Sequence, residues 1–151
     1  MEIVRVKYDT FGKWEKQIEE LINESVKINF PDQDAGSNYG SDKCTQLREY
    51  LKTGSAVVFA AVEGDDLLGW LWCHQIYRLK KRRLHVSEIG VADQCQGRGI
   101  GQRLLKEAES FAKENGYEEI DLFVTASNGR AVDFYQRSSF TPERFLMKKK
   151  V

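Results

Sequence analysis

The chain lacks an excess of charge of either sign, and it lacks any long apolar segment. Its 151 residues carry 23 Lys and Arg against 23 Asp and Glu, so the formal net charge is zero. A balanced charge gives no general attraction to nucleic acid, and no nucleic-acid partner is expected. The longest apolar runs, residues 56–62 and 67–73, are far shorter than the ~20 residues that span a bilayer. No membrane partner is therefore expected.

Cysteine is scarce, and the first residues do not form a signal-peptide pattern. Residues 1–5 lack the apolar core of a secretory signal. The three cysteines are odd in number and widely spaced, which argues against a disulfide framework and against a zinc site. These features predict a cytoplasmic protein without a metal, and the length predicts one domain over residues 1–151 with a substantial core. The cysteines are Cys44, Cys73 and Cys95.

Hydrophobic periodicity predicts an α/β domain in which strands and helices alternate. Pro31 and Gly54 end two of the helices, and Ser41 is expected to cap the second helix. A turn at residues 64–66 is expected to join two strands as a hairpin. The predicted strands cover residues 2–8, 55–63, 67–77, 85–91, 119–124 and 143–149, and the predicted helices cover residues 14–28, 42–52, 100–115 and 129–137.

A glycine-rich stretch follows the predicted strand at 85–91. Gly97, Gly99 and Gly101 stand at alternate positions directly before an amphipathic helix. Glycine allows close approach of the backbone, and the first turn of a helix offers free N–H groups and the positive end of its dipole. A phosphorylated ligand is therefore predicted. Neither a Walker A loop nor a dinucleotide fingerprint fits, because no Lys-Ser or Lys-Thr pair follows and the third glycine comes one residue early.

Two motifs in this half of the chain resemble those of the GCN5-related N-acetyltransferases (GNAT). Residues 96–101 match Q-x-x-G-x-G, and residues 128–140 match N-x-x-A-x-x-F-Y followed by Ser-Ser-Phe. One helix and one strand separate them, as in the family, and the resemblance is specific over residues 84–141. Ser139 replaces the family's glycine, at a cost of ~1 kcal/mol if this residue is left-handed.

The resemblance implies a mixed, mostly antiparallel central sheet with flanking helices, in which two parallel strands splay apart. It also implies acetyl-CoA as the co-substrate. Pantetheine would pair with the backbone of the strand that ends at Val91, whose N–H would polarise the thioester carbonyl. Asn128 would contact the pantetheine arm or fix the following helix. The cofactor-binding residues implied are Ile89, Val91, Gln96, Gly97, Arg98, Gly99, Ile100, Gly101, Gln102, Asn128 and Tyr135.

The resemblance also implies direct transfer of the acetyl group to a primary amine of a small molecule or peptide. Tyr135 stands where the family places a tyrosine that protonates the departing thiolate. Glu88 is the candidate base for the amine, with Ser87, His85 and water as alternatives. His74 is expected to be a strand residue with no catalytic task, and Cys95 is not expected to act as a nucleophile.

The acceptor is less constrained by the sequence. The family's cleft is walled by the loop between the first two helices, where Asp32, Asp34 and Asp42 would suit a cationic amine or simply be solvated. The basic residues within 78–83 are expected to form a solvated hairpin tip. A silent CoA-binding regulatory domain is the alternative function, and the resemblance leaves a homodimer possible.

Overall fold

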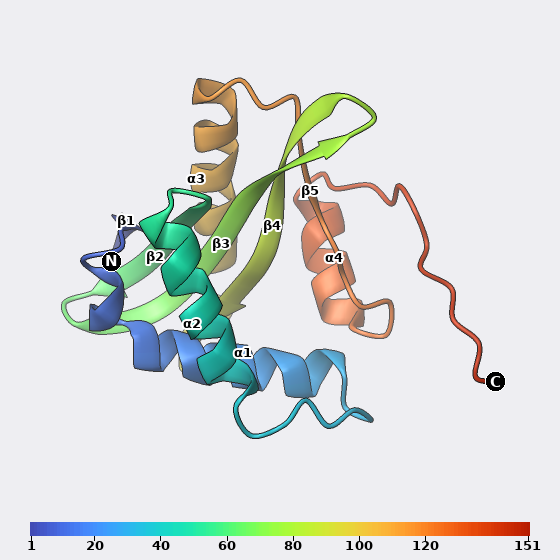
Figure 1. Cartoon of the computed structure of the whole chain (residues 1–151), viewed down its shortest axis with the longest axis horizontal. Coiled ribbons are helices and arrows are strands. Elements are labelled where there is room, and N and C mark those ends of the chain that lie inside the picture. Colours follow the sequence, from blue (N-terminus) through green and yellow to red (C-terminus); the bar gives the residue numbers. More distant parts are fainter.

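The elements follow the predicted alternation of strands and helices (Figure 1). The computed structural model describes all residues, 1–151. None of the helices combines the length and the apolar character that crossing a membrane requires. The strands are β1 (Glu2–Val6), β2 (Ala56–Glu63), β3 (Asp66–Arg78), β4 (Lys81–Val91) and β5 (Glu119–Leu122), and the helices are α1 (Glu15–Asn29), α2 (Tyr39–Lys52), α3 (Ile100–Glu114) and α4 (Gly129–Arg137), with short 3-10 turns at Phe11–Lys13 and Asp93–Cys95.

The five strands form one sheet in the order β1-β2-β3-β4-β5. All neighbours are antiparallel except β4 and β5, which are parallel, so the predicted mixed and mostly antiparallel sheet is confirmed. The parallel ladder begins at Arg83 opposite Glu119 and ends at Val86 opposite Leu122. Beyond this point residues 87–91 of β4 have no partner on the β5 side, so the two strands splay as predicted.

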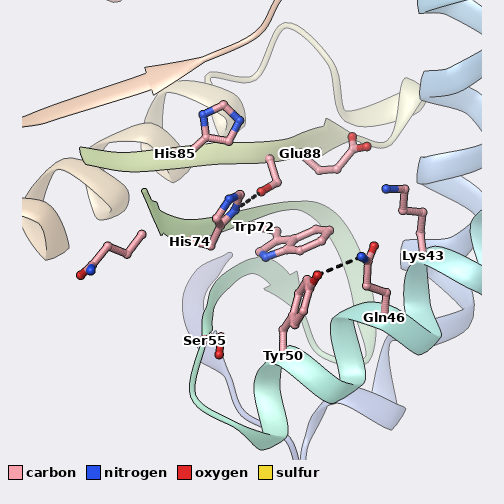
Figure 2. A pocket seen from close by; sticks show the side chains of 10 residues that line it. Lys43, Gln46, Tyr50, Ser55, Trp72, His74, His85 and Glu88 are labelled. Atoms are coloured by element: carbon pink, nitrogen blue, oxygen red, sulfur yellow. Dashed lines mark hydrogen bonds between the residues drawn. The ribbon is translucent and has the colours of Figure 1, made fainter. Parts of the chain in front are cut away.

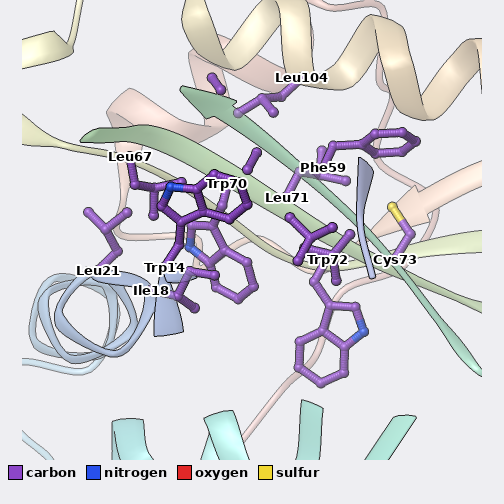
Figure 3. Packing of buried hydrophobic residues seen from close by; sticks show 14 of the residues in the cluster. Trp14, Ile18, Leu21, Phe59, Leu67, Trp70, Leu71, Trp72, Cys73 and Leu104 are labelled. Carbon is purple, nitrogen blue, oxygen red and sulfur yellow. The ribbon is translucent and has the colours of Figure 1, made fainter. Parts of the chain in front are cut away.

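Helices cover both faces of the sheet, which explains why β2 and the first half of β3 are almost entirely apolar. Tyr50 of α2 packs on Trp72 with ring centroids 5.9 Å apart, and Phe111 of α3 packs on Phe59 at 6.3 Å from the other side. Figure 3 shows Trp70, 1% exposed, among the buried side chains between the sheet and α1. A strand buried on both faces has no polar side to alternate, and β2 is accordingly buried from its first residue to its last but one.

Helix α2 begins at Tyr39, so the predicted start at residue 42 with Ser41 as the cap is wrong. Two hydrogen bonds explain why the helix begins three residues earlier than predicted. Asp34 Oδ1 accepts a hydrogen bond from the Gly36 N–H at 2.8 Å, which closes the preceding loop early. Asn23 of α1 accepts the Gly40 N–H at 3.0 Å and so satisfies a free donor of the first turn.

The predicted closing strand at 143–149 does not form, and the last residues extend away from the domain (Figure 1). Glu143 is held by Arg83 at 2.7 and 2.9 Å, but Phe145, Leu146 and Met147 are exposed. Three consecutive apolar residues cannot bury one face of a strand while the other faces water. The preceding Pro142 also has no N–H to donate to a sheet.

Substituting Ser139 with glycine is expected to stabilise the protein. Ser139 has φ of +67°, in the left-handed region that disfavours side chains, and it ends α4 in a Schellman turn. There the Phe140 N–H bonds to the Tyr135 carbonyl and the Ser139 N–H to the Gln136 carbonyl, both at 3.0 Å. Ser139→Gly should raise the free energy of unfolding by about 0.5–1 kcal/mol. This is the strain removed from the folded chain, reduced by the greater conformational entropy that glycine gives the unfolded chain.

Thermal and urea unfolding would measure this change. Ser138→Gly is the matched control, because Ser138 has an ordinary φ of −91° and its hydroxyl donates to the Phe134 carbonyl at 2.9 Å. The control should lose stability. Equal losses in both variants would show that the left-handed turn carries no strain.

Candidate active site

The glycine-rich loop presents free backbone donors at the start of α3. Gly97 and Gly99 both have left-handed φ, +78° and +75°, and Gly99 is the residue before the first helical turn. The first hydrogen bond of that helix runs from the Arg103 N–H to the Gly99 carbonyl at 3.1 Å. The N–H groups of Ile100, Gly101 and Gln102 precede it and stay available at the positive end of the helix dipole. This geometry suits a pyrophosphate.

Other residues of the motif hold the loop in shape. The Gln96 amide donates to the Val91 carbonyl at 3.3 Å and to Asp93 Oδ1 at 2.7 Å, so it ties the loop to the end of β4. Arg98 contacts the sulfur of Cys95 at 3.6 Å. A Cβ on Gly101 would lie 3.1 Å from the Phe134 ring, so this glycine lets α4 pack against the start of α3.

Asn128 fixes the start of α4. Its Oδ1 accepts a hydrogen bond from the Ala131 N–H at 3.2 Å, and its Nδ2 donates to Asn29 Oδ1 at the end of α1, at 3.0 Å. Of the two roles predicted for Asn128, the structure contains the one that fixes the helix. The pantetheine contact stays a prediction.

A bulge in β4 decides which of its side chains face the space between this strand and α2. Glu88 pairs with Trp72 and Val86 pairs with Cys73, so Ser87 is an extra residue in this strand. In a regular strand Glu88 would point away from the side that holds His85 and Ser87, because successive side chains alternate. The bulge breaks this alternation, and all three line one cavity.

This cavity has a volume of about 390 Å³ and lies between α2, β3 and β4 (Figure 2). It is called the acceptor cavity below, after the amine acceptor that the family resemblance predicts. Trp72 and Tyr50 form its aromatic part, and polar side chains form most of the rest. Its lining residues are Lys43, Gln46, Tyr50, Ser55, Trp72, His74, Gln75, His85, Ser87 and Glu88.

Glu88 lines this cavity, and its charge also acts on Tyr135 of α4. Burial raises the pKa of Glu88 to about 7, and the nearby Lys43 ammonium opposes part of that rise. Burial also raises the pKa of Tyr135 to about 12, with a smaller contribution from the Glu88 carboxylate. The Glu88 carboxylate is therefore close enough to Tyr135 to influence its pKa. Both shifts favour the protonated form, so Tyr135 keeps its proton at neutral pH.

The far end of the cavity holds two imidazoles. His74 Nδ1 lies 2.6 Å from Ser87 Oγ, and His85 Nδ1 lies 2.6 Å from Asp121 Oδ1 on β5. The two rings meet edge to face with centroids 5.2 Å apart. Burial lowers the pKa of His74, His85 lowers it further, and Asp121 partly offsets both. His74 is therefore part of the cavity wall and bonded to the bulged serine, which the expectation of a strand residue with no catalytic task did not include.

The acidic loop is not the wall of this cavity. Asp32, Asp34 and Asp42 are exposed and none of them lines it. The wall comes from α2, through Lys43, Gln46 and Tyr50, which the sequence analysis did not single out. Their spacing of i, i+3 and i+7 places them on one helix face, and that was the available signal.

The basic hairpin also differs from its prediction. Arg83 is only 8% exposed and is not part of a solvated tip. It contacts Glu119, Asp121 and Glu143 at the junction of β4, β5 and the C-terminal segment. Within the chain, no group of three or more His, Cys, Asp or Glu side chains could hold a metal ion.

Comparison with known proteins gives consistent matches. The model of the acetyltransferase (GNAT) family matches residues 17–140. Mycothiol acetyltransferase of Propionibacterium freudenreichii subsp. shermanii is 27% identical over 120 residues, which are 80% of this chain and 38% of that protein. Streptothricin acetyltransferase of Streptomyces lavendulae is 36% identical over 116 residues, which are 76% of this chain and 56% of that protein. The chain thus spans about two fifths to just over half of the length of these relatives.

A solved structure supports the same fold. An aminoglycoside acetyltransferase from an uncultured soil metagenomic sample, in complex with sisomicin, superposes with a TM-score of 0.76. The match covers 99% of this chain and 94% of that chain at 19% sequence identity. At this identity the likeness concerns the architecture of the sheet and its helices.

Proposed function

Because the chain belongs to the acetyltransferase (GNAT) family, we propose that it transfers the acetyl group of acetyl-CoA directly to a primary amine of a small molecule. The observation that carries the proposal is the position of Glu88. This residue lines the acceptor cavity and lies on the part of β4 that has no β5 partner. That open strand edge leads at Val91 into the loop with the free N–H groups. The open edge of β4 and the acceptor cavity therefore meet at a group that can accept a proton.

The donor side fits acetyl-CoA, which supplies the activated acetyl thioester when bound. The open edge of β4 offers backbone groups at Ile89 and Val91 for pairing with the pantetheine arm. The Val91 N–H would donate to the thioester carbonyl as that oxygen gains negative charge. Backbone N–H groups of residues 97–102 would hold the pyrophosphate, and Gln96 and Asn128 keep the loop and α4 in place.

Two side chains carry the proton transfers in this proposal. Glu88 accepts the proton of the amine, since a carboxylate with a pKa of about 7 is matched to a base that works at neutral pH. Tyr135 holds its proton at neutral pH and donates it to the departing thiolate. Ser87 and His85 line the same cavity and stay alternatives for the base.

The proposed acceptor class follows the relatives and the size of the cavity. The streptothricin acetyltransferase is named for a small molecule, and about 390 Å³ lies within the range of ~300–1,000 Å³ typical of small-ligand pockets. A small amine is therefore favoured over a folded protein surface.

Thiol release from acetyl-CoA across a panel of amines tests this function. Tyr135→Phe should lower amine-dependent release at least about tenfold, as the loss of a general acid predicts. Tyr77→Phe is the matched control, because Tyr77 is 67% exposed on the β3–β4 hairpin, and it should behave as wild type. Binding of acetyl-CoA without turnover would indicate the silent CoA-binding domain instead. Absence of acetyl-CoA binding would overturn both readings.

A further inference from the structure

The acceptor cavity contains one fixed positive charge, at Lys43. This side chain is half-buried on α2 and lines the cavity together with Glu88. Its ammonium takes part in none of the chain's ion pairs. Its one described contact is the face of Tyr39, with Nζ 5.7 Å from the ring centroid. No carboxylate of the chain lies within ion-pair distance of this ammonium, and an anionic ligand would supply such a partner.

The rest of the lining does not favour a polycation. Glu88 is the only acid in it. Burial and the neighbouring His85 lower the pKa of His74, which disfavours a positive charge on this ring. Asp121 lies behind His85 and is already balanced by Arg83 at 3.2 Å and Arg78 at 3.5 Å. An acceptor with several ammonium groups would therefore meet Lys43 as a like charge and find one carboxylate, which is also the proposed base.

We propose that the acceptor is an amine that carries a carboxylate close to its nitrogen, as an α-amino acid does. Lys43 binds the carboxylate and Glu88 receives the proton of the amine. Figure 2 shows these two side chains pointing toward one another across one end of the cavity. Trp72 and Tyr50, with rings 5.9 Å apart, then offer an apolar wall for the rest of the acceptor. This inference rests on the proposed acetyltransferase function and adds the acceptor class to it.

The test compares α-amino acids with their own primary amides, which keep the shape and the amine but lose the negative charge. Wild type should have a higher kcat/KM for the acids. Lys43→Met should lower kcat/KM for the acids at least about tenfold more than for the amides, the loss expected for one hydrogen bond to a charged group, because the effect of Lys43 on the pKa of Glu88 is common to both kinds of substrate. Lys43→Arg keeps the charge and should retain the preference. Lys52→Met makes the same substitution at an exposed position of α2 outside the cavity and should match wild type.

The comparison of acids with amides separates carboxylate binding by Lys43 from a mere effect of Lys43 on the pKa of Glu88. If Lys43 only tuned the pKa of Glu88, Lys43→Met would change the rates for acids and amides by the same factor, and the inference would be overturned. Amides used as well as acids by wild type would overturn it too. Thiol release with amines that lack a carboxylate, but none with the α-amino acids, would overturn this inference and leave the acetyltransferase function standing. Absence of release with every amine would overturn the proposed function and this inference together.

Discussion

Glu88→Gln is expected to lower kcat/KM by about a hundredfold or more, the usual loss when a general base is removed. Glutamine keeps the shape of the side chain but cannot accept the proton of the amine. In wild type the rate should rise as pH increases through about 7, where Glu88 ionises. That rise should be absent in the variant. The measurement is kcat/KM across the neutral range with a weakly basic amine, so that ionisation of the acceptor does not mask that of the enzyme.

Stability should change in the opposite direction, which separates lost chemistry from misfolding. The pKa of Glu88 lies above its unfolded value of 4.5. The folded chain therefore holds this proton more tightly, and ionisation of Glu88 lowers stability as pH rises from about 4.5 to 7. Glu88→Gln removes this penalty, so the variant should be at least as stable as wild type at neutral pH.

The matched control is Glu49→Gln on the exposed face of α2, which should keep wild-type kinetics. Ser87→Ala and His85→Asn test the alternative bases. If Glu88→Gln kept the wild-type rate and its pH dependence while one of these two variants lost both, the base would be assigned to that residue instead.

The position of Glu88 also marks where sequence reasoning stopped. The motif spacing was sufficient to predict the loop at residues 96–101, because that loop depends on local turns, and the resemblance to the family implied the open edge of β4. The direction of the Glu88 side chain depends on its pairing with Trp72, sixteen residues earlier. It also depends on the bulge at Ser87, which interrupts the regular pairing of β4 with β3. Strand periodicity alone would place Glu88 on the face opposite His85. The bulge is a property of the paired strands and not of either segment.

A similar limit applies to the wall of the acceptor cavity. The buried face of α2, with Cys44 and Leu47, could be predicted from its apolar spacing. Its polar face, with Lys43 and Gln46, has the composition of any solvated helix surface. Only the packing of α2 across β3 and β4 turns that face into a cavity wall.

Arg83→Met is expected to lower the free energy of unfolding by about 2 kcal/mol, because it removes charged hydrogen bonds and leaves nearby acids unpaired. The guanidinium binds Glu143 through two nitrogens, at 2.7 and 2.9 Å, and Asp121 at 3.2 Å. Methionine retains the apolar stem, so most of the loss should come from the charge. Glu143 would also lose its hold on the chain after α4, and faster cleavage by protease should therefore begin beyond Phe140.

The pH dependence of that loss identifies its cause. Arg83 holds the pKa of Glu143 below its ordinary value of 4.5, so the contribution of this pair is present above that value and disappears as pH falls below it. The gap between wild type and Arg83→Met should therefore be widest at neutral pH and narrow in acid. Arg82→Met is the control, since Arg82 stacks on Tyr117 at 4.5 Å and bonds to Gln75 outside this network. A gap that stayed constant with pH would assign the loss to packing of the side chain, and the carboxylates would then contribute nothing to holding β4, β5 and the C-terminal segment together.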